Sequence, residues 1–209
     1  YWTGEHGVCV PRTMTADLAE LVGYFMGDGS LHTKGLRFCV AQDDTDVVDR
    51  LVGLGQTLFG LRAALTPKRG YTEVAFHSVR LALWWEACQF AKEIPEGHRG
   101  KGLTAMVPDA VLHTNSGEIY GAFVRGLFEA DGTVSSGYVS FSTVSLDFSR
   151  DVQSLLMALG FVTTRKVDAP GSGWGHRDRY VLRLLNASTA ADFGQTIRFI
   201  SARKQALCQ

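Results

Sequence analysis

The feature that most constrains this chain is an internal repeat. Residues 21–31 (LVGYFMGDGSL) and 124–134 (VRGLFEADGTV) share the pattern Gly-x-x-x-small-Asp-Gly, and Asp131 follows Asp28 by 103 residues in a chain of 209. The similarity continues downstream, where each Asp-Gly precedes a polar stretch, an alternating run and a run of helical periodicity. Such a repeat predicts two halves that share one order of secondary-structure elements. The alternative is a chance similarity between two α+β stretches.

Each half is predicted to run helix, two strands, helix, two strands, helix. Alternating residues predict strands over 36–40 and 138–142, and apolar spacing predicts a helix over 46–59 and another that ends at Gly160. Hairpin-like stretches at 61–80 and 163–185 lead into closing helices near 80–92 and 188–204. The expected fold is α+β, with tandem αββαββα halves at 1–114 and 115–209. A pseudo-two-fold axis would relate them, giving a saddle of two antiparallel sheets around two central packed helices.

Composition excludes several classes of protein. The 21 basic residues balance the 21 acidic ones, and 45% of residues are hydrophobic, which is ordinary for a globular chain. Four scattered cysteines, the absence of a signal peptide and the absence of any apolar run of about 20 residues favour an intracellular, cytoplasmic protein.

The two repeated segments are predicted to be helices that pack against each other. Thr15 and Ser116 suit the N-cap positions, and the glycines after the two aspartates suit a left-handed turn at the helix end. Glycine inside a helix destabilises the helix by about 1 kcal/mol relative to alanine. A stripe of small residues present in both repeats therefore indicates that these positions have a structural role. Small residues let two helix backbones approach closely. The predicted interface residues are Gly23, Gly27, Gly126 and Ala130.

Packing of these helices would bring Asp28 and Asp131 together at two negative helix ends. Two adjacent carboxylates repel each other, and a divalent cation removes that conflict. Carboxylates and main-chain oxygens are the ligands that Mg²⁺ prefers. We therefore predict a Mg²⁺ site formed by both aspartates and the main chain of Gly27 and Ala130. The alternative for either Asp-Gly alone is a simple turn.

These residues carry a family resemblance. Gly23–Gly29 and Gly126–Gly132 resemble the two signature segments of LAGLIDADG homing endonucleases, with Met26 standing where the family often has an acid. The resemblance covers nearly the whole chain and is strongest to the two-motif, single-chain endonuclease domains of inteins. It implies site-specific cleavage of double-stranded DNA, with Asp28 and Asp131 as catalytic metal ligands.

The resemblance also implies a basic residue near the scissile phosphate in each half. In the second half Lys204 matches the pattern, with a solvated helix end as its alternative role. In the first half Ala105 stands at the family's usual lysine position, and Lys101 is the substitute candidate. This departure leaves open a nicking enzyme or slow cleavage of one strand.

Basic residues are concentrated where strands are predicted. The segment from Arg165 to the end contains eight basic and three acidic residues, and residues 61–80 contain four basic residues and one acidic one. Arginine reads guanine edges and also binds phosphate, so these strands are predicted to lie on DNA, although a solvated basic face is the alternative. The candidate DNA contacts are Lys34, Arg37, Arg62, Lys68, Arg69, Tyr71, Tyr138, Arg165, Lys166, His176, Arg177, Arg179 and Arg183.

The predicted function is Mg²⁺-dependent cleavage of double-stranded DNA at a long specific target by a monomeric pseudo-dimer. Two alternatives use the same scaffold: a catalytically silent DNA-binding regulator and an RNA maturase. A cleavage assay separates the first from an endonuclease, and relative affinity for structured RNA and duplex DNA separates the second.

Overall fold

The computed structural model describes residues 8–90, 105–135, 137–169 and 177–208. Its first elements are α1 (Ala16–Asp28), β1 (Gly29–His32), β2 (Gly35–Ala41), α2 (Thr45–Phe59), β3 (Ala64–Lys68), β4 (Tyr71–His77) and α3 (Val79–Ala87). The later elements are α4 (Asp109–Leu112), α5 (Gly117–Asp131), β5 (Thr133–Ser135), β6 (Tyr138–Thr143), α6 (Leu146–Ala158), β7 (Thr163–Asp168), β8 (Arg179–Leu184), α7 (Ala187–Thr196) and α8 (Ala202–Ala206). The predicted α+β fold with a repeated element order is confirmed, while the boundary at residue 114 stays a prediction.

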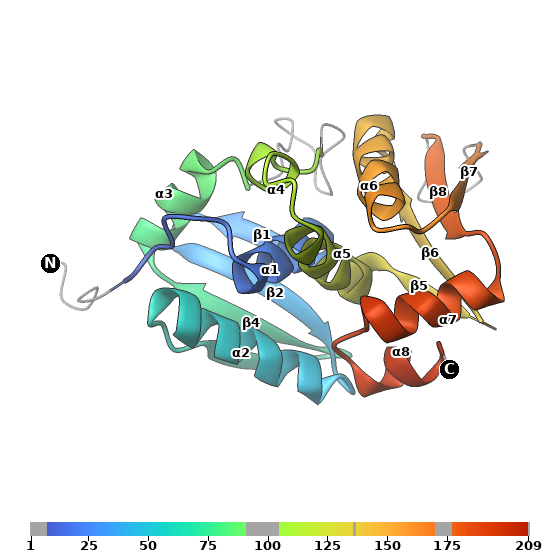
Figure 1. The fold of residues 1–209 in the computed structure, drawn as a ribbon. Helices are drawn as coiled ribbons and strands as arrows, with labels where there is room; N and C mark the ends of the chain where they lie inside the picture. Colours follow the sequence, from blue (N-terminus) through green and yellow to red (C-terminus); the bar gives the residue numbers. More distant parts are fainter. Residues whose placement is uncertain (1–7, 91–104, 136, 170–176, 209) are drawn as a thin grey trace, which may run out of the picture.

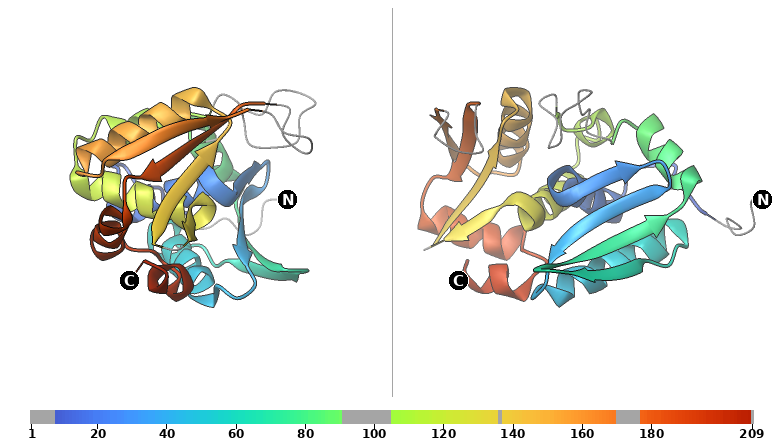
Figure 2. Two further views of the ribbon diagram at one scale, coloured as in Figure 1. Left: turned by 90° about the vertical axis from the view of Figure 1, so that its right-hand side faces the viewer. Right: turned by 180° about the vertical axis from the view of Figure 1, so that it is seen from behind.

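Two four-stranded antiparallel sheets flank a central pair of helices. The strand orders are β1-β2-β4-β3 and β5-β6-β8-β7, so the two sheets are connected in the same way. Figure 1 shows α1 and α5 side by side at the centre, with α2 along one side of the first sheet. Seen from behind in Figure 2, the strands of the first sheet lie in front of these helices. Each sheet therefore has a face packed on helices and a face turned away from them.

Aromatic side chains form the core on the helix side of both sheets. Phe38 of β2 packs against Phe25 of α1, and Phe25 packs edge-on against Trp85 of α3. In the second half Phe128 of α5 packs against Phe141 of β6. The buried residues form one cluster that runs through both halves. None of the described helices is long and apolar enough to cross a membrane.

The termini of the repeated helices agree with the prediction only in part. Thr15 accepts a hydrogen bond from the backbone N of Leu18 at 3.2 Å, and Ser116 accepts one from Ile119 at 3.4 Å, as expected for N-caps. The left-handed turns expected after the aspartates are wrong, because Gly29 has φ −90° and Gly132 has φ −74°. Glycine is needed there for space: a Cβ on Gly132 would lie 2.4 Å from the carbonyl oxygen of Phe128.

The closing helix predicted over 188–204 is two helices. The chain leaves helical geometry after α7, Arg198 adopts a left-handed φ of 67°, and α8 starts a new helix at Ala202. The break has a tertiary cause, since the linking backbone donates hydrogen bonds to a buried carboxylate on α5. Periodicity along the chain does not report such a contact.

Candidate functional site

The backbones of α1 and α5 touch at their small residues. An added Cβ on Gly23 would lie 2.0 Å from the carbonyl oxygen of Phe123, and one on Gly126 would lie 2.0 Å from that of Glu20. Gly27 faces Ala130 across the same interface, where its added Cβ would lie 2.3 Å from the alanine Cβ. The structure thus brings together the four predicted interface residues, in reciprocal pairs as a pseudo-two-fold axis requires.

This packing brings the C-terminal ends of the two helices together. Asp28 is the last residue of α1 and Asp131 the last of α5, and both side chains are half-buried. An added Cβ on Gly27 would lie 3.4 Å from the backbone N of Asp131, which shows how close the ends are. Two partly exposed carboxylates beside two negative helix ends fit a divalent cation. Among the described residues no group of three or more His, Cys, Asp and Glu side chains has metal-binding geometry, so further ligands would be main-chain, water or phosphate oxygens.

Tyr24 shows the negative potential of this region. Its hydroxyl donates a hydrogen bond to the carbonyl oxygen of Cys39 at 3.0 Å, which ties α1 to β2. Burial raises the pKa of the Tyr24 phenol well above its ordinary value, and the charges of Asp28 and Glu129 raise it further. The hydroxyl therefore stays protonated, and it serves here as a structural donor.

Lys204 lies beneath the end of α5. Its side chain is buried, and Nζ donates to the carbonyl oxygens of Phe128 (3.1 Å), Glu129 and Gly132 (2.9 Å). Burial lowers the pKa of Lys204, while the nearby charge of Glu129 acts in the opposite direction. An ammonium group has three donors, and all three are used on the helix end that carries Asp131. The side chain thus neither occupies a solvated helix end nor leaves a donor free for a phosphate.

Glu129 holds the segment that positions Lys204. Its buried carboxylate accepts hydrogen bonds from the backbone N of Ile200 (2.7 Å), the backbone N of Ser201 (2.9 Å) and the Ser201 hydroxyl (2.7 Å). Sequence reasoning did not assign this residue a role. The available signal was an acid next to the apolar pair Leu127 and Phe128, at the position where the first copy has Met26.

The start of α8 also contacts the first half of the chain. Arg203 forms a bidentate ion pair with Asp44 at 2.9 and 2.7 Å, and the backbone N of Ala202 donates to Asp46 at 2.6 Å. Asp44 is the N-cap residue of α2 and Asp46 lies in its first turn, yet both also hold a segment about 160 residues away. The two halves are therefore linked at α8 as well as through the central helices.

A buried acid joins the central helices to α2. The Glu20 carboxylate on α1 accepts from Nε of Arg50 and from Nε of Arg125, each at 2.6 Å. Arg50 also bonds Asp17 at 2.7 Å, and Arg125 reaches the carbonyl oxygen of Ile197 at 3.4 Å. One side chain thus connects α1, α2 and α5.

Most of the predicted DNA contacts lie on the sheet faces turned away from the helices or in adjoining loops. Residues opposite each other in an antiparallel pair share a face, so the strand register shows on which face of the sheet each side chain lies. Arg37, Lys68 and Tyr71 lie on the open face of the first sheet, while Lys34, Arg62 and Arg69 lie in its connections. The open face of the second sheet carries Tyr138, Lys166, Arg179 and Arg183.

Two of the predicted contacts lie off the open sheet faces, and two candidate residues lie outside the described part of the chain. Arg165 pairs with the buried Leu182, so its side chain starts from the helix-covered face of an edge strand. Arg177 precedes β8 and belongs to no strand, because β8 begins only at Arg179. The undescribed candidates are Lys101 and His176.

The open face of the second sheet is ordered by one cation–π contact and two ion pairs. The guanidinium carbon of Arg183 lies 3.7 Å from the centre of the Tyr138 ring, a cation–π stack across β6 and β8. Asp168 pairs with Lys166 and Arg179, both at 2.9 Å, and these cations lower the pKa of its carboxyl group. The Arg183 guanidinium is thus held in place by an aromatic ring.

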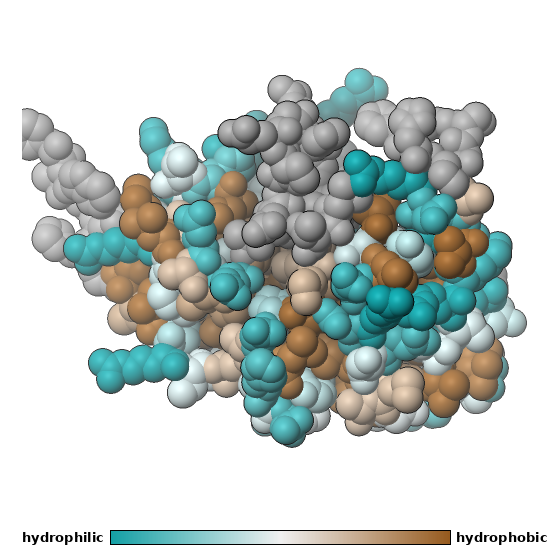
Figure 3. Space-filling model, turned by 90° about the horizontal axis from the view of Figure 1, so that it is seen from above, coloured by the Kyte–Doolittle hydropathy of each residue, from teal (hydrophilic) through white to brown (hydrophobic). Residues whose placement is uncertain are grey.

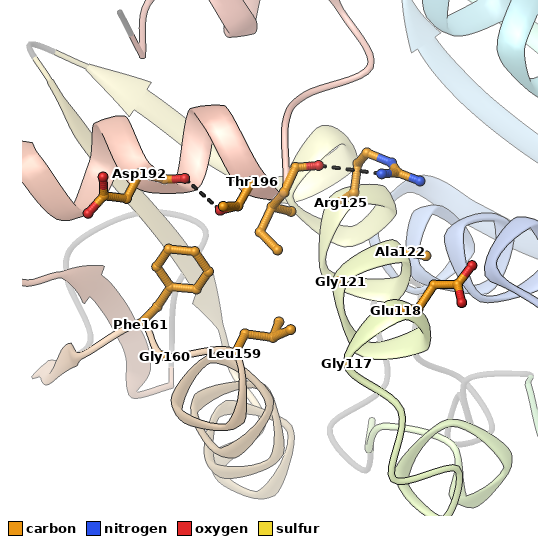
Figure 4. A pocket seen from close by; sticks show the side chains of 11 residues that line it. Gly117, Glu118, Gly121, Ala122, Arg125, Leu159, Gly160, Phe161, Asp192 and Thr196 are labelled. Carbon is orange, nitrogen blue, oxygen red and sulfur yellow. Dashed lines mark hydrogen bonds between the residues drawn. The ribbon is translucent and has the colours of Figure 1, made fainter.

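A groove of about 540 Å³ lies on the helical side of the second half. Its wall includes Gly117 and Glu118 in the first turn of α5, with Phe161 and Asp192 opposite (Figure 4). Asp131 stands at the other end of α5, so this groove is separate from the aspartate pair. Seen from above in Figure 3, the described part of the surface carries hydrophobic residues in small groups between hydrophilic ones.

Part of the chain matches a known domain family. Residues 118–198 match the family model of the LAGLIDADG-like domain. The chain is 24% identical over 177 residues to a glutamine--fructose-6-phosphate aminotransferase of Methanocaldococcus jannaschii, and 25% identical over 184 residues to the ATP-dependent DNA helicase Hel308 of Thermococcus kodakarensis. Each match covers 82% of this chain but only 15% and 16% of the relative. The chain therefore spans a small part of these longer proteins.

Solved structures share the fold over nearly the whole chain. The crystal structure of I-DmoI in complex with DNA and Mn superposes with a TM-score of 0.61 and 17% identity, covering 88% of this chain and 96% of that one. Full-length DUF199/WhiA from Thermatoga maritima superposes with a TM-score of 0.58 and 13% identity, covering 94% and 60%. I-DmoI is a homing endonuclease. Residues 118–198 therefore form a LAGLIDADG-like domain, and the chain has the fold of I-DmoI over nearly its whole length.

Proposed function

We propose that this protein is a site-specific endonuclease that cleaves double-stranded DNA by Mg²⁺-dependent phosphodiester hydrolysis. The observation that carries the proposal is the meeting of Asp28 and Asp131 at the tips of two touching helices. Binding alone does not need two carboxylates at a helix interface, where they repel each other. The relatives solved with DNA and with Mn, Ca or Mg support a divalent metal at this place in the fold.

Asp28 and Asp131 would hold the metal, with the main-chain oxygens of Gly27 and Ala130 as further ligands. A bound divalent cation lowers the pKa of water and stabilises charge at the reacting phosphate. The two helix ends add negative potential that favours a cation at this point. Lys204 is a positioning residue in this proposal, because it fixes the end of α5 and hence the place of Asp131. Lys101 remains the proposed basic residue of the first half.

The two open sheet faces would hold the duplex. Arg37 and Lys68 on the first sheet, with Lys166, Arg179 and Arg183 on the second, supply cations for phosphates and donors for base edges. Because the acids lie mainly on helices, a zero net charge is compatible with two basic surfaces. Binding is then expected to weaken steeply with salt.

The same segment matches proteins of different activities, which supports a further part of the proposal. An aminotransferase, a helicase and a replication factor C subunit of Methanocaldococcus jannaschii each match over 10–16% of their length. A segment shared by proteins with unrelated names is typical of an inserted element, so we propose an intein endonuclease. Two repeated halves in one chain complete the pseudo-dimer, so it would act as a monomer.

The deciding experiment is cleavage of a randomised duplex library with Mg²⁺, followed by sequencing of the cut ends. Asp28→Asn and Asp131→Asn should lose double-strand cleavage while they retain DNA binding. Asp49→Asn is the matched control, since it makes the same charge change on an exposed part of α2. Specific binding without cleavage by the wild type would favour the silent regulator, and preference for structured RNA would favour the maturase. Undiminished cutting by either aspartate variant would refute the site.

A further inference from the structure

Glu73 lies near the centre of the open face of the first sheet. It belongs to β4, between Cys39 on β2 and Thr66 on β3. Its chain neighbour Val74 is fully buried against the helices, so the alternation of the strand places Glu73 on the opposite face. The face that would lie on DNA therefore carries a half-buried carboxylate among its basic residues.

The Glu73 side chain has no polar partner among the described residues. The predicted contacts Arg37 and Lys68 are diagonal neighbours across the ladder, yet neither forms an ion pair with it. The charges of Glu73 and Arg37 both act on His32. Burial and Arg37 lower the pKa of His32, and Glu73 raises it. Glu73 thus shares a surface with these groups and remains available to a ligand.

A carboxylate in this position needs a specific partner in any complex with DNA. Phosphate oxygens repel it, and thymine and guanine present mainly acceptors in the major groove. The exocyclic N4 amine of cytosine is the donor that Glu and Asp accept from, whereas adenine presents its N6 donor beside the N7 acceptor, which repels a carboxylate. Repulsion from phosphate and attraction to this amine together favour one base at one position of the target.

Resting on the proposed function, we propose that Glu73 is a specificity-determining residue that accepts a hydrogen bond from a cytosine amine in the target half facing the first sheet. Arg183 has the opposite chemistry on the second sheet. Its guanidinium, stacked on Tyr138, suits the O6 and N7 acceptors of guanine. The two sheets would then read different bases on opposite sides of the cut.

The test is selection of bound and cut sites from a randomised duplex library by five proteins: the wild type, three variants of the sheet faces and one control. The wild type should require cytosine at one position, with at least about a tenfold preference over other bases. Glu73→Gln should change that position to adenine, because glutamine pairs with adenine N6 and N7. Glu73→Ala should lose the preference there and keep all others. Arg183→Ala should alter a position on the other side of the cut.

Three outcomes would overturn the proposal. If Glu73→Gln binds all sequences more tightly and keeps the wild-type preference, Glu73 only opposes nonspecific binding. If Glu73→Ala keeps the cytosine, another residue reads that base. In both cases specific cleavage by the wild type leaves the proposed function standing. If the wild type selects no duplex sequence, the proposed function and this inference fail together. Asp49→Asn should change no base preference.

Discussion

Replacing Gly23 with alanine tests whether the central helices touch as closely as the structure requires. The new Cβ would lie 2.0 Å from the carbonyl oxygen of Phe123, 2.9 Å from its carbon and 3.0 Å from the backbone N of Leu127. All three obstacles are backbone atoms, so no side-chain rotation relieves the contact. The helices must separate by roughly 1.4 Å to restore ordinary contact distances.

The expected cost follows from two opposing terms. Overpacking costs about 1–3 kcal/mol, and we take the upper end because the obstacle is a backbone. Alanine returns about 1 kcal/mol of helix propensity, which leaves a net loss of about 2 kcal/mol of unfolding free energy. For a chain of this length that corresponds to a fall in Tm of roughly 4–8 °C. Separation of the helix ends should also reduce the cleavage rate by about 10²-fold through misplacement of Asp28 and Asp131.

Gly53 provides the matched control. It lies inside α2, and an added Cβ there would meet nothing within 4 Å. The same substitution should therefore stabilise the protein by about 1 kcal/mol and leave cleavage unchanged. Urea unfolding and cleavage under saturating DNA measure both effects. If Gly23→Ala unfolds at the wild-type urea concentration and cuts at the wild-type rate, the close packing of α1 on α5 is refuted.

Three further predictions follow from the charged contacts. Glu20→Ala should lower the unfolding free energy by about 2 kcal/mol, because two arginines lose their shared buried acceptor, and wild-type stability in urea would argue against the network. Lys204→Met should lower stability and cleavage together, since three buried carbonyls lose their donor. Loss of cleavage at unchanged stability would instead indicate a direct contact with phosphate. The pKa of the Asp168 carboxyl group, measured by NMR titration, should lie below its ordinary value and should rise in Lys166→Met. A carboxyl whose folded pKa is lowered adds stability above its unfolded pKa, and that stability is lost as pH falls through the folded pKa; an unshifted titration would contradict this.

Features that depend on residues near each other in the chain were predictable. The caps at Thr15 and Ser116 are signals within three residues, and the strand and helix periods repeat over short windows. The stripe of small residues indicated close helix packing, because both repeats contain residues that destabilise an isolated helix. Since packing of the two stripes brings both helix ends together, the proximity of the two aspartates also followed from the sequence.

Contacts between distant parts of the chain were decided only by the tertiary structure. Glu129 reaches a backbone 72 residues away and breaks the last predicted helix, and Arg203 reaches Asp44 across 159 residues. Lys204 was expected near phosphate but is buried under α5, because three carbonyls at the helix end take its donors. Local periodicity reports which face of an element is apolar. It contains no information on which buried acid or carbonyl will meet a given donor, because that depends on how the two halves are placed in space.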